Sequence, residues 1–92
     1  MISALVLINA DRRQIPETAQ ALLAIDGVAE VFSVTGEYDL VATLRLREYE
    51  QLATVVTERM AEIEAITRTH TMLAFRQFSR ADLEQAFSIG VD

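Results

Sequence analysis

The stretch VFSVTGEYDLVATLRL, residues 31–46, contains two apolar runs joined by a turn. In its second half, the residues Leu40, Ala42, Leu44 and Leu46 alternate with Val41, Thr43 and Arg45, which is the period-two pattern of a β-strand. Its first half belongs to a run at 28–35 that is rich in β-branched and aromatic residues, a composition typical of strands. Gly36 supplies the backbone freedom that a tight turn needs. We therefore predict a β-hairpin with strands at 28–35 and 39–46.

Two further strands and two helices are predicted around this hairpin. Residues 2–9 form the first strand, and ITRTHTMLAFRQF, residues 66–78, forms the fourth. Pro16 suits the first turn of a helix, where its missing N–H would have no partner anyway, and Gly27 suits the end of that helix. A second helix over 48–64 is indicated by an apolar stripe at helical spacing, formed by Leu52, Val55, Val56, Met60 and Ile63.

The order βαββαβ predicts an α+β fold of the ferredoxin-like kind. Right-handed crossovers place the strands in the order 4-1-3-2 in an antiparallel sheet, with both helices on one face. We assign residues 1–78 to this domain. Residues 79–92 form a predicted helical tail, because Ser79 and Asp82 resemble a capping box ahead of Leu83, Ala86 and Phe87.

The strands carry apolar residues on both faces of the predicted sheet. In the first strand, Leu5 and Leu7 face away from Val6 and Ile8. Two helices cover only one face, so the other would expose more apolar surface than the few hundred Å² that soluble monomers usually tolerate. A second copy, packed sheet against sheet, would cover it. We therefore expect at least a homodimer.

The composition excludes several classes of function. The net charge is −6, and the eight basic residues, all arginine, are scattered, so the chain lacks the basic stripe of a nucleic-acid binder. With no cysteine and one histidine, His70, the chain offers no expected metal site. The apolar N-terminus is shorter than the ~20 residues of a membrane-spanning helix, and no cleavage signal follows it. We expect a cytoplasmic protein that contacts neither membrane nor nucleic acid.

The turn TGEYDL, residues 35–40, holds groups that suit a zwitterionic ligand. Backbone N–H groups around Gly36 can form a small anion-binding concavity. Asp39 can accept charge-assisted hydrogen bonds from an ammonium group, and Tyr38 offers an apolar wall with a terminal hydroxyl. A purely local interpretation also stands. Gly36 can serve only the φ angle of the turn, Asp39 can form an Asx-turn with its own backbone, and tyrosine is a common strand residue.

Thr69 and Thr71 are a second candidate half-site. They share one face of the fourth strand, and this strand starts at the same end of the sheet as the third. Two strand gaps separate the two starts by roughly 10 Å, so a small ligand would touch both only with help from a neighbouring subunit. The alternative is that two threonines merely satisfy the preferences of an edge strand.

The run VFSVTGEYDLVATLRL, followed by ITRTHTMLAF, resembles the effector-binding RAM domain of the Lrp/AsnC regulators over about residues 2–78. The resemblance implies a dimeric α/β barrel type of fold that pairs through its sheets and assembles into rings, often octamers. It also implies an amino acid ligand near the hairpin. Gly36, Tyr38 and Asp39 would line the pocket, with Asp39 taking the amino group, and Thr69 and Thr71 would form another wall.

Typical members of that family carry a helix-turn-helix domain, whereas this sequence starts at the first strand. We expect a stand-alone RAM protein that senses an amino acid or co-assembles with a full-length Lrp/AsnC regulator. No catalytic residue, cofactor or metal is expected. The alternative from another class is a cofactor-free, oxygenase-like enzyme of the dimeric α/β barrel type. A third is a structural partner that binds no ligand, which an internally bonded Tyr38 or Asp39 would favour.

Overall fold

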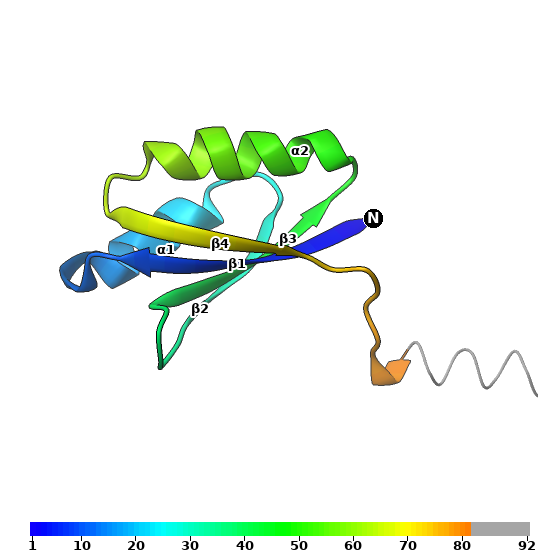
Figure 1. The fold of residues 1–92 in the computed structure, drawn as a ribbon, viewed down its shortest axis with the longest axis horizontal. Helices are drawn as coiled ribbons and strands as arrows, with labels where there is room; N and C mark the ends of the chain where they lie inside the picture. Colours follow the sequence, from blue (N-terminus) through cyan, green and yellow to red (C-terminus); the bar gives the residue numbers. More distant parts are fainter. Residues whose placement is uncertain (82–92) are drawn as a thin grey trace, which may run out of the picture.

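The structure, a computed structural model, describes residues 1–81. These residues form strands and helices in the predicted order (Figure 1): β1 (Ile2–Ala10), α1 (Ile15–Leu23), β2 (Val28–Ser33), β3 (Leu40–Leu46), α2 (Tyr49–Ala53) and β4 (Ile66–Leu73). The helix that begins as α2 continues through a π-helical segment, Thr54–Arg59, and a 3-10 turn, Met60–Glu62. The predicted tail helix through Leu83 and Phe87 lies outside the described residues.

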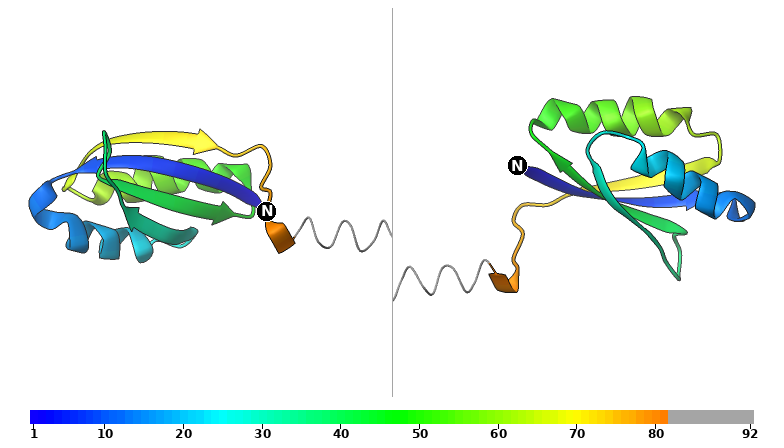
Figure 2. Two further views of the ribbon diagram at one scale, coloured as in Figure 1. Left: turned by 90° about the horizontal axis from the view of Figure 1, so that it is seen from below. Right: turned by 180° about the vertical axis from the view of Figure 1, so that it is seen from behind.

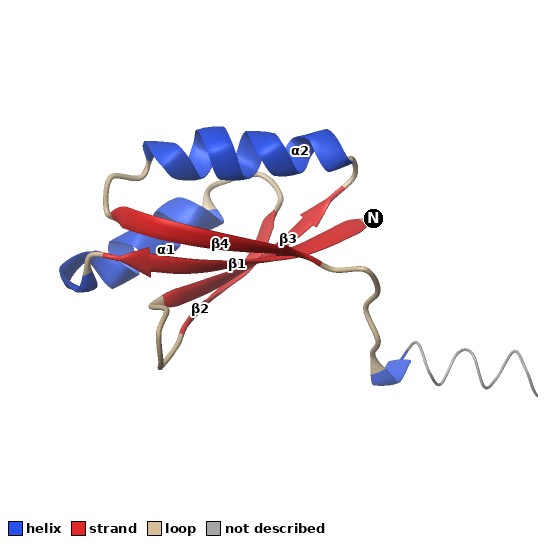
Figure 3. Cartoon of the chain, in the orientation of Figure 1, coloured by secondary structure: helices blue, strands red, loops and turns tan. Residues whose placement is uncertain are grey.

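The four strands form one antiparallel sheet in the order β2-β3-β1-β4. This order confirms the predicted arrangement and the ferredoxin-like fold. Both helical segments pack on the same face of the sheet, which Figure 3 shows by secondary structure and Figure 2 from two further sides. The opposite face, called here the open face, has no helix on it among the described residues.

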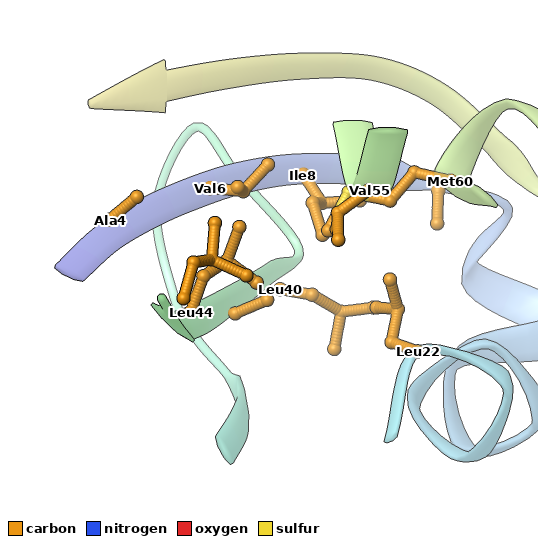
Figure 4. Packing of buried hydrophobic residues seen from close by; sticks show 11 residues of the cluster. Ala4, Val6, Ile8, Leu22, Leu40, Leu44, Val55 and Met60 are labelled. Atoms are coloured by element: carbon orange, nitrogen blue, oxygen red, sulfur yellow. The ribbon is translucent and has the colours of Figure 1, made fainter. Parts of the chain in front are cut away.

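The core lies between the sheet and the helices (Figure 4). Alternate residues of the two central strands point into it, because successive side chains of a strand point to opposite faces. The helical layer contributes Leu22, Val55 and Met60, each at most 4% exposed. The strand residues of this core are Ala4, Val6, Ile8, Ala10, Leu40, Ala42, Leu44 and Leu46.

Two sequence signals act at the ends of the helices as expected. Pro16 lies in the first turn of α1. Gly27 follows that helix with φ +101°, and a Cβ atom there would lie 2.6 Å from Cδ2 of Leu46. Glycine is therefore required at Gly27 for both its conformation and its size. At the start of α2, Oε1 of Gln51 accepts hydrogen bonds from the N–H groups of Arg47 (2.7 Å) and Glu48 (3.0 Å).

The fourth strand ends earlier than predicted. It stops at Leu73, so its predicted extension to residue 78 is wrong. The N–H of Ala74 still donates to the carbonyl of Ser3 at 3.0 Å. By the register of the pairing, β1, which begins at Ile2, reaches only as far as Phe75, so residues 76–78 would have no neighbour on β1. Residues 74–78, called here the arm, leave the end of β4 and run away from α2 (Figure 1).

Candidate ligand-binding site

The β2–β3 loop forms a tight, exposed turn at one end of the sheet. The N–H of Val34 donates to the carbonyl of Asp39 at 3.0 Å and closes the turn. Gly36 has φ +105°, and no atom lies within 4 Å of a Cβ built there. Its glycine is therefore needed for conformation alone, and the space around it is open to solvent.

Asp39 links this loop to the end of β1. Its Oδ2 accepts a hydrogen bond from the N–H of Ala10 at 3.0 Å and a longer one from the Asn9 amide at 3.4 Å. Nε of Arg12 lies 3.6 Å from the other oxygen, Oδ1. The hydrogen bond from Ala10 is the main reason that the pKa of Asp39 lies below its ordinary value; Asn9 and Arg12 lower it further, and partial burial opposes them. The carboxylate is thus charged at neutral pH and already has internal partners.

Asn9 is a site residue that sequence reasoning missed. The side-chain amide of Asn9 donates to the main-chain carbonyl of Glu37 at 2.8 Å, and the main-chain carbonyl of Asn9 accepts from the hydroxyl of Thr67 at 3.2 Å. The pairing of β1 with β4 shifts register between Asn9 and Ala10. The end of β1 is therefore tied to both the loop and the start of β4. The available signal was an amide-bearing residue at the end of an otherwise apolar strand.

Tyr38 is half-buried beside the start of β4. The guanidinium carbon of Arg68 lies 5.9 Å from the centre of its ring, within the range of a cation–π contact. Arg68 pairs with Asn9 across the two strands, and Asn9 alternates with the core residues Ile8 and Ala10. Arg68 therefore lies on the open face and approaches the tyrosine ring from that side. This contact was also missed at the sequence level.

Thr69 and Thr71 lie on the opposite face. They pair with Ile8 and Val6, both core residues, so they point to the side of the helices, while His70 pairs with Leu7 and points to the open face. Thr69 lines a cleft of about 200 Å³ at the C-terminal end of the second helical segment, beside Met60.

The two half-sites therefore share an end of the sheet but not a face. Leu40, at the start of β3, and Thr69 both pair with Ile8, which places them on either side of β1 as expected. Tyr38 contacts the open-face residue Arg68, whereas the threonines point the other way. One chain alone does not bring all five predicted residues around a small ligand.

Residues 1–81 hold no group of three or more histidine, cysteine, aspartate or glutamate residues placed to bind a metal ion. Nor do they contain a helix of the length and apolarity needed to cross a membrane.

Comparison with known proteins places the chain in a family. A model described as the Lrp/AsnC ligand binding domain matches residues 3–83. The solved structure of TTHA0845 from Thermus thermophilus is 45% identical, with a TM-score of 0.80 over 87% of this chain and 100% of that one. The transcriptional regulator FL11 of Pyrococcus furiosus is 31% identical over 75 residues, 82% of this chain and 49% of the regulator.

A more distant structure shows the same fold. The transcriptional regulator NMB0573 of Neisseria meningitidis, solved in complex with L-Met, is 12% identical with a TM-score of 0.75, over 86% of this chain and 53% of that one. The chain spans between 39% and 49% of the length of the curated regulators from Pyrococcus furiosus that it matches. The predicted resemblance is confirmed: the chain belongs to the Lrp/AsnC ligand binding domain family.

Proposed function

We propose that this chain is an oligomeric regulatory module of the cytoplasm that binds an amino acid and does not itself bind DNA. The observation that carries the proposal is the apolar character of the open face. Leu5 is 37% exposed, Phe32 49% and Met72 41%, on three different strands of one sheet. A second copy packed sheet against sheet would remove these side chains from water, and further association would build the octamer or larger ring.

The loop at the end of the sheet offers the groups for a zwitterion. Asp39 uses Oδ2 internally, but an ionised carboxylate has about four acceptor positions. Within residues 1–81, Oδ1 faces only Arg12, whose side chain is 87% exposed. A ligand ammonium group can replace or join that guanidinium. The open space at Gly36 suits the ligand carboxylate, and Tyr38 forms a wall. The L-Met complex of the Neisseria relative supports this ligand class.

The other wall of the pocket is proposed to come from a neighbouring subunit. Thr69 and Thr71 lie on the face away from Tyr38, so they complete the pocket of another chain and not of their own. This division would couple ligand binding to assembly. It would also let the chain act on a full-length Lrp/AsnC regulator by joining its ring.

Thermal unfolding in the presence of each of the twenty amino acids tests the ligand. A compound at 100 times its Kd stabilises the folded protein by about 2.7 kcal/mol, a readily measured shift in melting temperature. Asp39→Asn keeps an oxygen for the N–H of Ala10 but removes the charge, so this variant should fold and lose the shift. Glu37→Gln, which removes a charge two residues away, should keep it. An Asp39→Asn protein that binds as the wild type does would refute the pocket.

A second candidate is a structural partner that binds no ligand. The internal hydrogen bonds of Asp39 favour it, since they give the carboxylate a role in tying the loop to β1. If all twenty amino acids leave the melting temperature unchanged, native mass spectrometry of mixtures with a full-length Lrp/AsnC regulator becomes the test. Mixed rings would support this candidate. The relatives are transcriptional regulators, and no observation on residues 1–81 favours the enzyme alternative.

A further inference from the structure

The arm carries two aromatic side chains that the rest of the described chain does not cover. Phe75 is 102% exposed and Phe78 is 76% exposed. Aromatic side chains bury 150–250 Å² each when they find a partner surface, so their exposure is unfavourable in water. They follow directly on Met72 and Leu73, each 41% exposed, at the end of β4. The arm therefore places two exposed aromatic rings just beyond the end of the sheet.

The arm adds aromatic surface to the apolar area that a second copy can cover. Four strands about 4.8 Å apart and seven paired residues long measure about 19 by 24 Å, or roughly 450 Å² in projection. A specific interface buries about 800 Å² on each partner. Two aromatic side chains would supply roughly 300–500 Å² of accessible surface, about half of that area. The two rings of the arm would therefore form a substantial part of a dimer interface.

The arm also borders a hollow on the open face. Ala74, Arg76 and Gln77 line it from the arm, while Leu5 and Thr43 line it from the sheet. Its volume is about 300 Å³, the lower end of the range for small-molecule sites, so it can accept an aromatic ring. Each chain thus carries two exposed rings and, on its open face, a hollow that can receive one. In a two-fold dimer such contacts occur twice, because each copy gives and receives the same group.

We propose that the arm completes the dimer by crossing onto the open face of a second copy, where Phe75 and Phe78 pack beside Leu5 and Thr43. The occupant of the hollow is an aromatic side chain of that copy. This inference rests on the sheet-to-sheet pairing of the proposed function and adds the residues that make the pairing stable. The interface is then a face plus two exchanged arms.

Dimer dissociation measured on the full chain tests the arm separately from the face. The double variant Phe75→Ala/Phe78→Ala should raise the dimer Kd at least about 100-fold, as expected for the loss of aromatic anchors. Tyr49→Ala, which removes an exposed aromatic ring on α2, should leave the Kd unchanged. If Phe32→Ala weakens the dimer and the arm variant does not, the arm inference fails and the sheet pairing stands. If neither weakens it, both fail.

Cross-linking gives a second test that does not depend on the stability of the variants. The sequence has no cysteine, so single cysteines can be introduced without background. Equal amounts of Phe75→Cys and Thr43→Cys chains are mixed and oxidised; a disulfide between the two chains is expected. Phe75→Cys mixed with Tyr49→Cys is the control and should remain uncrosslinked. Equal yields in the two mixtures would show random encounter and overturn the proposal.

Discussion

Replacement of Phe32 by alanine is expected to dissociate the proposed dimer. Phe32 lies on β2 opposite Val41, on the open face, and remains 49% exposed in the single chain. An aromatic residue can bury 150–250 Å², so roughly 100 Å² of Phe32 is left for a partner to cover. At about 20–25 cal/mol per Å², this area contributes about 2 kcal/mol per chain to the free energy of dimerisation.

The symmetry of a dimer doubles this effect. Because both copies lose the ring, the dimer should be weakened by about 4 kcal/mol, close to a thousandfold in Kd at 1.4 kcal/mol per factor of ten. Sedimentation velocity over a dilution series measures the Kd, and circular dichroism checks that the monomer is folded.

The matched control is Tyr49→Ala. Tyr49 is 61% exposed, more than Phe32, but it lies at the start of α2 and not on the open face. If exposure of an aromatic ring were the cause, both variants would change association alike. A Phe32→Ala protein that dimerises as tightly as Tyr49→Ala and the wild type would refute the assignment of the open face as the interface.

Three further expectations concern the loop, the glycines and DNA. The hydrogen bond from the N–H of Ala10 lowers the pKa of Asp39 in the folded protein. The ionised carboxylate of Asp39 therefore stabilises the fold above the unfolded-state pKa of about 4, and this stabilisation is lost as the pH falls through the lower folded-state pKa. The urea midpoints of the wild type and of Asp39→Asn should therefore differ less at pH 2 than at pH 7. Gly27→Ala should destabilise the fold by roughly 1–3 kcal/mol through strain plus a clash with Leu46, whereas Gly36→Ala meets open space and should be milder in urea unfolding. With a net charge of −6, the chain should not shift duplex DNA in a gel at physiological salt; a salt-dependent shift would contradict this.

The central part of the fold follows from periodicity. Alternation along β1 and β3 predicts which residues of each strand share a face. Val6 and Ile8 of β1 and Leu44 of β3 lie in the core as this alternation requires. The crossover rule then leaves one strand order for βαββαβ, which the sheet adopts. Element ends were harder to predict. The apolar pattern continues past Leu73, but a strand also needs a neighbour, and β1 reaches only as far as Phe75 in the register of the pairing. The start of β1 is not encoded in the residues of β4.

The second helix shows a similar limit. Its apolar stripe predicts one continuous helix over 48–64, and the chain is helical from Tyr49 to Glu62. The π-helical segment within it, Thr54–Arg59, differs from an α-helix in its i→i+5 hydrogen bonds, and the apolar positions of so short a stretch do not reveal that pattern. Periodicity therefore could not distinguish it from an α-helix.

At the site, the types of residue could be predicted but their partners could not. Asp39 reads as a turn residue or a ligand acceptor, yet its closest hydrogen-bond donor is the N–H of Ala10, 29 residues earlier. Arg68 reads as one of many scattered arginines until the pairing of β1 with β4 brings it over Tyr38. Such contacts depend on strand register, which a local motif does not specify.

Division of the proposed site between chains has a thermodynamic consequence. If Asp39 of one subunit and the threonines of another hold the same amino acid, the ligand binds the assembled form better than the single chain. By linkage, the factor by which assembly raises ligand affinity equals the factor by which the ligand raises assembly. A module of this kind converts an amino acid concentration into an oligomeric state. It could then affect transcription without binding DNA itself, because the full-length regulator in the mixed ring would bind the DNA.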